Sequence, residues 1–157
     1  MATPSFEQFA EIKAEAETFY AGIGAVYSPY LKKSVAFNAK GLDHLKLKEW
    51  NKARSIDDQC RRLRIIQYAP LIVQASHTVQ GLSYVDRFER RQTNSRWERV
   101  MMRIVYYEFI AVLQNIRIRC IVKELPGGQP FFWSIMPYWR TDGNGRRRFT
   151  YGNPEID

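Results

Sequence analysis

The sequence predicts a single α+β domain, residues 1–157, with N-terminal helices packed on one face of a four- to five-stranded antiparallel sheet. Its length fits one hydrophobic core, since a typical domain has about 150 residues. Helical spacing of apolar residues is confined to the first half of the chain, and the clearest strand alternation lies in the second half. Helices and strands do not alternate along the chain, as they would in a parallel sheet.

Two helices are expected before residue 76. Residues 5–20 place apolar side chains at steps of three and four, and Ser5 is a suitable N-cap. A second helix begins at Ser55 with a capping-box pattern and is interrupted at Pro70. Because proline is acceptable in a first helical turn, residues 71–75 are expected to add one more turn.

Six stretches carry the residue types or the alternation of β-strands. Residues 116–123 show the clearest pattern, because apolar residues alternate there with mostly basic ones. Residues 97–113 are interpreted as a long strand, although a helix also fits their first part. From residue 141 the chain is rich in Gly, Asn and Arg, which predicts a basic tail in loop conformation over 141–157. The expected strands cover residues 34–38, 40–48 (a strand or strand-turn), 78–85, 97–113, 116–123 and 131–136.

The chain carries a strong positive charge. Lys and Arg number 24 against 16 Asp and Glu, which gives a formal net charge of +8 and a pI of about 9.7. This imbalance favours a polyanionic partner, and RNA, DNA and an acidic protein all fit it. No stretch approaches the roughly 18 apolar residues of a membrane span, and no signal-peptide pattern opens the sequence. We therefore expect a cytoplasmic protein with no membrane partner.

Motifs for metals and nucleotides are lacking. Cys60 and Cys120 are isolated in the sequence, which disfavours a zinc site or a disulfide framework and predicts two buried thiols. There is no phosphate-binding glycine loop, no paired-carboxylate spacing and no hydrolase serine motif. We expect neither a metal nor a cofactor.

A cationic face is predicted on the strand 116–123. Since side chains alternate across a strand, Arg117, Arg119 and Lys123 point to the face opposite the apolar residues that the helices cover. This face is suited to phosphate contacts. A solvated strand face without a ligand is the alternative interpretation.

The strand expected at residues 131–136 pairs with the strand 116–123, and its register determines which of its residues lie on the cationic face. A shift of one residue in its register exchanges Ser134 for Trp133, so both arrangements stay open. A two-residue Gly-Gly turn predicts these opposite pairs: Ile121 with Ser134, Arg119 with Met136, and Lys123 with Phe132.

His44 is a candidate acid or base. It lies among Lys40, Lys46 and Lys48, whose charges disfavour its protonated form. Beside a phosphate, such an imidazole is able to move a proton near neutral pH. A surface or capping histidine is the alternative.

The middle of the chain is rich in arginine, and aromatic residues lie near these arginines in the sequence. Guanidinium groups pair with phosphates and stack on bases, and aromatic rings stack on bases as well. Trp139 and Arg140 are accordingly candidates for nucleic-acid binding, together with Lys40, Lys48, Arg117 and Lys123. The aromatic residues also suit a core.

Three segments in this order resemble the barnase, colicin-ribonuclease and RelE-like (BECR) nucleases, especially their compact phage- and toxin-associated branch. They are residues 34–44 (SVAFNAKGLDH), 62–70 (RLRIIQYAP) and 131–137 (FFWSIMP), so the resemblance spans roughly residues 34–137. It implies a metal-independent endoribonuclease, a toxin or phage effector, with His44 and Ser134 facing a cleft. The branch commonly has a second histidine after the first, and Lys46 and Lys48 stand there instead.

The mechanism expected from this resemblance is attack of the RNA 2′-hydroxyl on the adjacent phosphate. His44 would move a proton, Arg119 and Lys46 would stabilise the developing charge, and Ser134 would position a phosphate oxygen or the base. Two alternatives remain open: a non-catalytic nucleic-acid-binding module, and an adaptor for an acidic partner. An acidic antitoxin or immunity protein would be such a partner.

Overall fold

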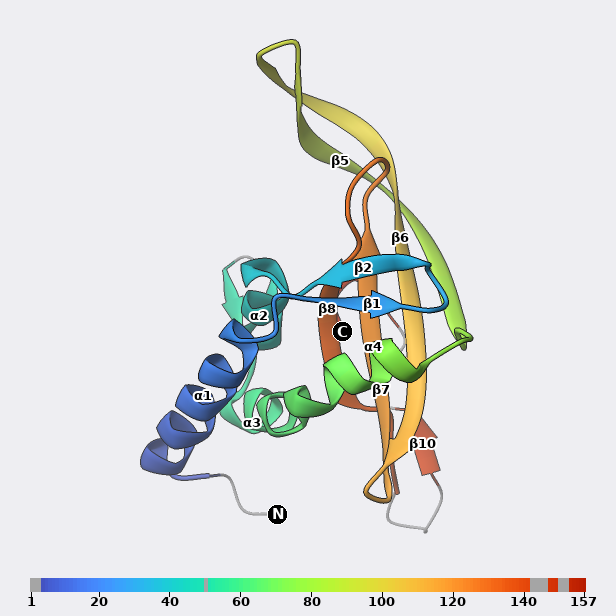
Figure 1. Cartoon of the computed structure of the whole chain (residues 1–157). Coiled ribbons are helices and arrows are strands. Elements are labelled where there is room, and N and C mark those ends of the chain that lie inside the picture. Colours follow the sequence, from blue (N-terminus) through green and yellow to red (C-terminus); the bar gives the residue numbers. More distant parts are fainter. Residues whose placement is uncertain (1–3, 50, 142–146, 150–152) are drawn as a thin grey trace.

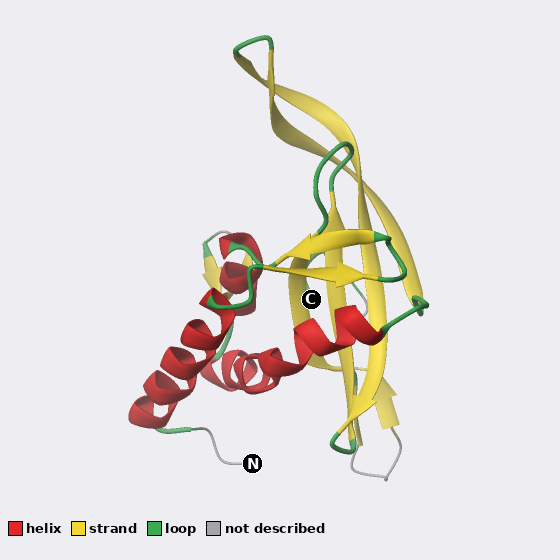
Figure 2. Ribbon diagram, viewed as in Figure 1, coloured by secondary structure: helices red, strands yellow, loops and turns green. Residues whose placement is uncertain are grey.

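The structure is a computed structural model that describes residues 4–49, 51–141, 147–149 and 153–157. Helices cover one face of a six-stranded sheet, as Figures 1 and 2 show. The strand order is β1-β2-β8-β7-β6-β5, and every neighbouring pair is antiparallel except β2 and β8. The predicted α+β class is therefore confirmed, with a slightly larger sheet than expected.

The elements follow the chain from helices to strands. The helices are α1 (Phe6–Ala21), α2 (Ala39–Lys46), α3 (Ile56–Ile65), the 3-10 helix η1 (Ile66–Tyr68) and α4 (Ala69–Ala75). The strands of the main sheet are β1 (Ala25–Ser28), β2 (Lys33–Ala36), β5 (Gly81–Thr93), β6 (Arg96–Leu113), β7 (Ile116–Glu124) and β8 (Phe131–Pro137). Two small hairpins are formed by β3 (Leu47–Glu49) with β4 (Lys52–Ala53), and by β9 (Trp139–Thr141) with β10 (Arg147–Phe149).

Caps in the sequence set the starts of the predicted helices. The Ser5 side chain accepts a hydrogen bond from the Gln8 amide and completes a capping box at α1. Ser55 caps α3 in the same way by accepting from the Asp58 amide. Both predicted helices are confirmed, and Pro70 lies in the first turn of α4, where it removes no helical hydrogen bond.

The segment 40–48 corrects a sequence prediction. It was expected to form a strand or strand-turn, but most of it is helix α2, which Asn38 caps. Gly41, His44 and Leu45 are its buried residues, and their spacing of three and four is that of a helix face. Of the lysines that suggest strand alternation, Lys40 and Lys46 lie in this helix, whereas Lys48 lies in the short strand β3.

Other boundaries also differ from the prediction. The strand expected at 78–85 begins at Gly81 and runs on to Thr93. Strand β1 was not predicted, and Arg147–Phe149, expected as loop, forms β10. Residues 142–146 and 150–152 of the expected tail lie outside the described residues.

The main core lies between the helices and the sheet. On β7 the core residues are Ile118, Cys120 and Val122, which are fully buried. The intervening residues of β7 point to the opposite face, which we call the outer face. The predicted division of this strand into an apolar face and a cationic face is thus confirmed.

Candidate functional site

A β-bulge in β8 shapes the outer face. The predicted pairs Ile121 with Ser134 and Arg119 with Met136 are both present. Lys123 lies opposite Phe131 and not Phe132, because the register shifts beyond Ile121 and leaves Trp133 as the extra residue. The connection from β7 to β8 is also longer than the Gly-Gly turn that was predicted.

The edge of β8 gives the helices access to the outer face. Strand β2 pairs with β8 only at Ala36 and Phe131, and no other strand within the described ranges pairs with the rest of that edge. Helices α2 and α3 pack against β8 there. Side chains from these helices therefore reach around the edge of the sheet.

Three guanidinium groups meet at this place, and we call them the arginine cluster. Arg54 follows β4, Arg62 comes from α3, and Arg119 comes from β7. Arg62 and Arg119 are only 1% and 2% exposed, and Arg54 is buried as well. Burying a charge is costly unless it is paired, so such a cluster requires anionic or polar partners.

Asp157 is the common partner of the arginine cluster. Its backbone oxygen accepts from Arg54 Nη2 at 3.1 Å, from Arg62 Nη1, and from the Ser134 hydroxyl at 2.7 Å. Its carboxylate accepts from Arg119 Nη1 at 2.7 Å. Arg62 Nη1 also donates to Ser134 Oγ at 2.7 Å, so the hydroxyl lies within the same network.

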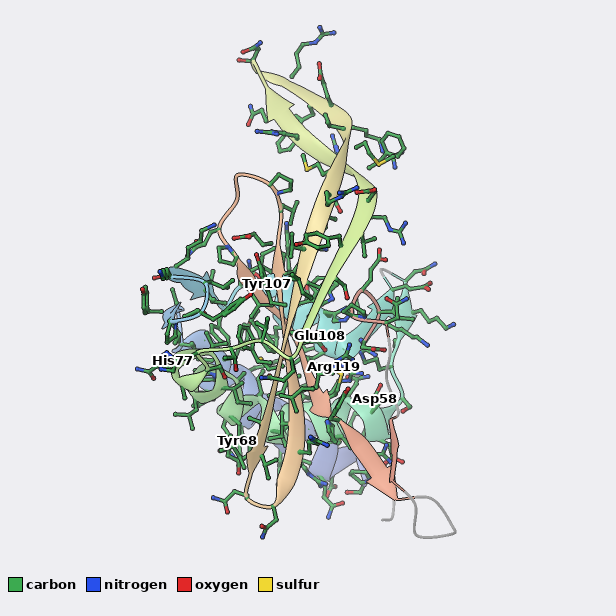
Figure 3. All side chains as sticks on the ribbon, turned by 90° about the vertical axis from the view of Figure 1, so that its right-hand side faces the viewer. Asp58, Tyr68, His77, Tyr107, Glu108 and Arg119 are labelled. Atoms are coloured by element: carbon green, nitrogen blue, oxygen red, sulfur yellow. The ribbon has the colours of Figure 1, made fainter. Side chains whose placement is uncertain are left out.

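Two further carboxylates complete the charge balance. Asp58 pairs with Arg62 at 2.9 Å, and Glu108 pairs with Arg119. In Figure 3, Asp58, Glu108 and Arg119 lie on one side of the long strands, whereas His77 and Tyr68 lie on the other. With Asp157, three negative charges face three guanidinium groups. The Nε atom of Arg119 is buried and has no hydrogen-bond partner among the described residues.

His44 borders the cluster as a neutral, buried imidazole. Its ring stacks on Trp133 with centroids 4.0 Å apart, and its Nε2 accepts from Arg54 Nη2 at 3.1 Å. Burial, followed by the charges of Arg54, Arg62 and Lys123, lowers the His44 pKa to about 2, against a smaller opposing effect of a hydrogen bond with the Asp157 backbone. The ring is therefore uncharged at neutral pH.

Residues 153–157, which we call the closing segment, lie across this part of the outer face. Trp133 Nε1 donates to the backbone oxygens of Pro154 and Glu155, at 3.1 and 3.2 Å. Glu155 receives two hydrogen bonds of 2.7 Å from Arg87 of β5. The segment is thus held at its middle by Arg87 and at Asp157 by the arginine cluster.

Pockets lie on both sides of the closing segment. One of about 570 Å³ is lined by His44, Lys123, Trp133 and Glu155, among others. A second, of about 330 Å³, is lined by the arginines Arg54 and Arg62 with Asp58 and Asp157. Lys48 and Ile156 contribute to both pockets, so the closing segment separates two parts of one groove.

The predicted lysines of the groove border the larger pocket. Lys40 and Lys48 line it from the α2–β3 side. Lys123 lies over the Trp133 ring at 4.1 Å, and burial lowers its pKa. The same pocket is also lined by four carboxylates, those of Asp43, Glu49, Glu89 and Glu155, so these lysines do not give it a net positive lining.

Two of the predicted site residues lie away from the groove, and the side chains of two others are not among those that the structure describes. Lys46 pairs at 2.5 Å with Glu17 of α1 and lines neither pocket of the groove. Arg117 lies 5.8 Å from the Tyr138 ring, toward the far end of β7. Trp139 and Arg140 belong to β9, but their side chains lie outside what the structure describes.

Sequence reasoning therefore found His44, Arg119 and Ser134, which the fold brings together. It missed Arg54 and Asp157 as site residues, and it noted Arg62 only as part of an arginine-rich stretch. For Arg62 the sequence did carry a signal. The apolar i, i+3, i+4 pattern around it indicates that this arginine lies on the buried side of its helix.

Both cysteines are buried, as predicted, and burial raises the pKa of the Cys120 thiol to about 12. Among the described residues, no three His, Cys, Asp or Glu side chains gather where a metal ion would bind.

The fold and the cluster together define an α+β protein that holds a carboxylate in a buried, arginine-lined site. No protein family, curated protein or solved structure matches the chain. In the part of the chain that the structure describes, no helix is long and apolar enough to cross a membrane.

Proposed function

We propose that this protein is a metal-independent endoribonuclease that cleaves RNA by attack of the 2′-hydroxyl on the adjacent phosphate. The observation that carries the proposal is the convergence of three buried guanidinium groups and the Ser134 hydroxyl on Asp157, beside the His44 imidazole. Fixed donors of this kind stabilise charge that develops on a phosphorane.

In this proposal a phosphate takes the place of Asp157. A phosphodiester carries one negative charge, as the Asp157 carboxylate does. Its non-bridging oxygens would replace the backbone oxygen that accepts from Arg54, Arg62 and Ser134 and the carboxylate oxygen that accepts from Arg119. Guanidinium groups pair with phosphate and carboxylate in similar geometry. RNA therefore replaces the closing segment, and the charge balance with Asp58 and Glu108 is kept.

Each residue then has a distinct role. The cluster, with Arg54, Arg62 and Arg119, holds the non-bridging oxygens as the bond from the 2′-oxygen to phosphorus forms. Ser134 orients one of these oxygens. His44 Nε2 accepts the 2′-hydroxyl proton once Arg54 donates to the phosphate, and the 5′-oxygen leaves with a proton from water.

His44 is held as a neutral imidazole. In the structure burial, and then the neighbouring arginines, lower its pKa to about 2, so the ring is a weak base while the closing segment is in place. A phosphate bound in the cluster offsets the arginine charges, and this raises the basicity of the ring. The products are a 2′,3′-cyclic phosphate and a free 5′-hydroxyl, which DNA cannot give.

The biological setting in this proposal is that of the nucleases that the sequence resembles. A BECR-like enzyme of this size acts in the cytoplasm as a toxin or phage effector, and an acidic antitoxin or immunity protein would neutralise it. The +8 charge supports both an RNA substrate and an acidic inhibitor.

A second candidate is a non-catalytic RNA-binding module. The burial of His44, which is 5% exposed, favours it, because a base must reach its substrate. In that case, the cluster holds a phosphate but cuts nothing.

Cleavage of a mixed-sequence RNA, compared with a matched DNA and with or without EDTA, distinguishes the two. We expect EDTA-resistant cleavage of RNA alone, ending in 2′,3′-cyclic phosphate. Arg119→Ala should slow it by roughly 10²–10³-fold, by analogy with oxyanion-hole donors. His44→Ala should slow it at least several-fold. The matched controls are His77→Ala and Arg61→Ala, since both side chains are exposed. RNA binding without cleavage would identify the binding module instead.

A further inference from the structure

Strands β5 and β6 continue past the sheet as a free two-stranded ribbon. Pairing of β6 with β7 begins at Val105, whereas pairing of β5 with β6 runs on through residues 85–93 and 96–104. Figures 1 and 2 show this ribbon projecting beyond the helices and the other strands. A ribbon of two strands has little stability of its own. A ribbon of this length therefore calls for an explanation, and a binding role would provide one.

The two faces of the ribbon differ in their covering. Residues directly opposite each other in an antiparallel pair share one face. Val85, Met102 and Ile104 lie on the face that continues the outer face, and they are buried or half-buried. The other face, which we call the ribbon face, carries Phe88, Trp97 and Met101, and all three are more than half exposed; Tyr84, just before the ribbon on the same face, is also more than half exposed.

The ribbon face carries arginines between these apolar residues. Arg90 lies directly opposite Arg99, next to the opposite pair Phe88 and Met101. On the other side of the arginine pair comes Trp97, whose ring lies 5.5 Å from the Arg90 guanidinium. Like charges that face each other across two strands are destabilising, and an anion bound between them removes that cost.

We propose that the ribbon face binds single-stranded RNA. A single strand presents phosphates and planar bases in alternation, and the ribbon face presents the Trp97 ring, the arginine pair and the Phe88 ring in succession. The next pair along this face, Asp86 with Arg103, is an ion pair and is not part of the proposed site. Phosphates bind at Arg90 and Arg99, while bases stack on Phe88 and Trp97. A duplex hides its bases and is disfavoured, and an acidic peptide has no planar groups to stack. The choice of RNA over DNA rests on the proposed function.

A binding measurement with an uncleavable RNA tests this inference. The probe is a fluorescein-labelled 2′-O-methyl 12-mer, which lacks the attacking hydroxyl, and its affinity is read by anisotropy. Trp97→Ala should weaken binding about tenfold, which is within the range for loss of one stacked base. Val112→Ala is the matched control, because Val112 is also exposed but lies at the other end of β6.

The salt dependence separates the two faces of the ribbon. Arg99→Gln should reduce the slope of log affinity against log salt by about 0.7, the value for one lost phosphate contact on a single strand. Arg91→Gln, on the opposite face, should leave the slope unchanged. The inference would be overturned if the two arginine variants changed the slope equally, or if Trp97→Ala left the affinity unchanged. Tighter binding of a duplex or of a poly-Glu peptide than of the 12-mer would overturn it as well.

Cleavage of a dinucleoside phosphate keeps this test apart from that of the active site. This substrate has a single phosphate, and Trp97 lies beyond the β6–β7 pairing and on the face opposite Arg119, so Trp97→Ala should cleave it at the wild-type rate. If the wild-type protein cleaves neither RNA nor the dinucleoside phosphate, the proposed function fails while the 12-mer result still decides the ribbon inference. If Trp97→Ala slows cleavage of the dinucleoside phosphate, the ribbon is not a separate binding surface.

Discussion

Replacing Asp157 by Asn should release the closing segment and speed RNA cleavage. The substitution keeps the shape of the side chain but removes the charge that Arg119 Nη1 contacts at 2.7 Å. Both side chains of this pair are buried, with exposed fractions of 2% and 11%. A hydrogen bond to a charged group contributes about 1.5–3 kcal/mol. The open population should therefore rise roughly 10- to 160-fold, at about 1.4 kcal/mol for each factor of ten.

Two measurements check this expectation. Hydrogen exchange of the amides of residues 155–157 reports opening of the closing segment, and single-turnover cleavage of a short RNA reports access to the cluster. Both rates should increase in Asp157→Asn, and both should stay at the wild-type value in Glu11→Gln, an exposed carboxylate of α1. Faster exchange with slower cleavage would refute the reasoning, because Asp157 would then orient Arg119 for the reaction and not compete with RNA.

Three further predictions follow from burial. Because the pKa of His44 is far below its unfolded value, the unfolded chain binds more protons than the folded protein below about pH 6.5, and the free energy of unfolding should fall there by up to about 1.4 kcal/mol for each pH unit of acidification. In His44→Phe the melting temperature should therefore change less between about pH 6.5 and pH 5 than it does in the wild type. Gly41→Ala should lower the melting temperature, with a loss of about 1–3 kcal/mol, since its Cβ would lie 2.3 Å from the Phe132 carbonyl oxygen. Cys120, whose pKa burial raises to about 12, should react with a disulfide reagent only after unfolding, which a labelling time course at pH 8 would show.

The sequence predicts local features well where the chain carries its own signals. Ser5 and Ser55 cap helices where their patterns indicate, because capping depends on neighbouring residues only. The alternation in β7 likewise places Arg119 on the outer face and Cys120 in the core. The predicted opposition of Ile121 and Ser134 is present because the extra residue at Trp133 offsets the one-residue difference that the longer β7–β8 connection introduces.

Longer-range features had no such signal. The bulge at Trp133 is a tertiary feature, since it presents this ring to His44 of α2. Arg54 and Asp157 meet across more than a hundred residues of sequence, and only the open edge of β8 brings them together. Lys46 was wrongly grouped with the site because a strand at 40–48 would have pointed it the same way as His44, whereas helix α2 turns it toward Glu17.

The closing segment follows from the electrostatics of the site. Arg62 and Arg119 are nearly inaccessible to water, and each already pairs with one carboxylate, Asp58 or Glu108, so a further anion at the cluster lowers the remaining cost of burying their charges. Asp157 supplies that anion in the absence of RNA, and a phosphate supplies it in the proposed complex. Glu155 holds the same segment through Arg87, which belongs to the strand that forms the ribbon. RNA held on the ribbon face would lie on the other face of the same strands from the closing segment, so only an RNA strand long enough to pass around the edge of β5 would occupy both surfaces at once.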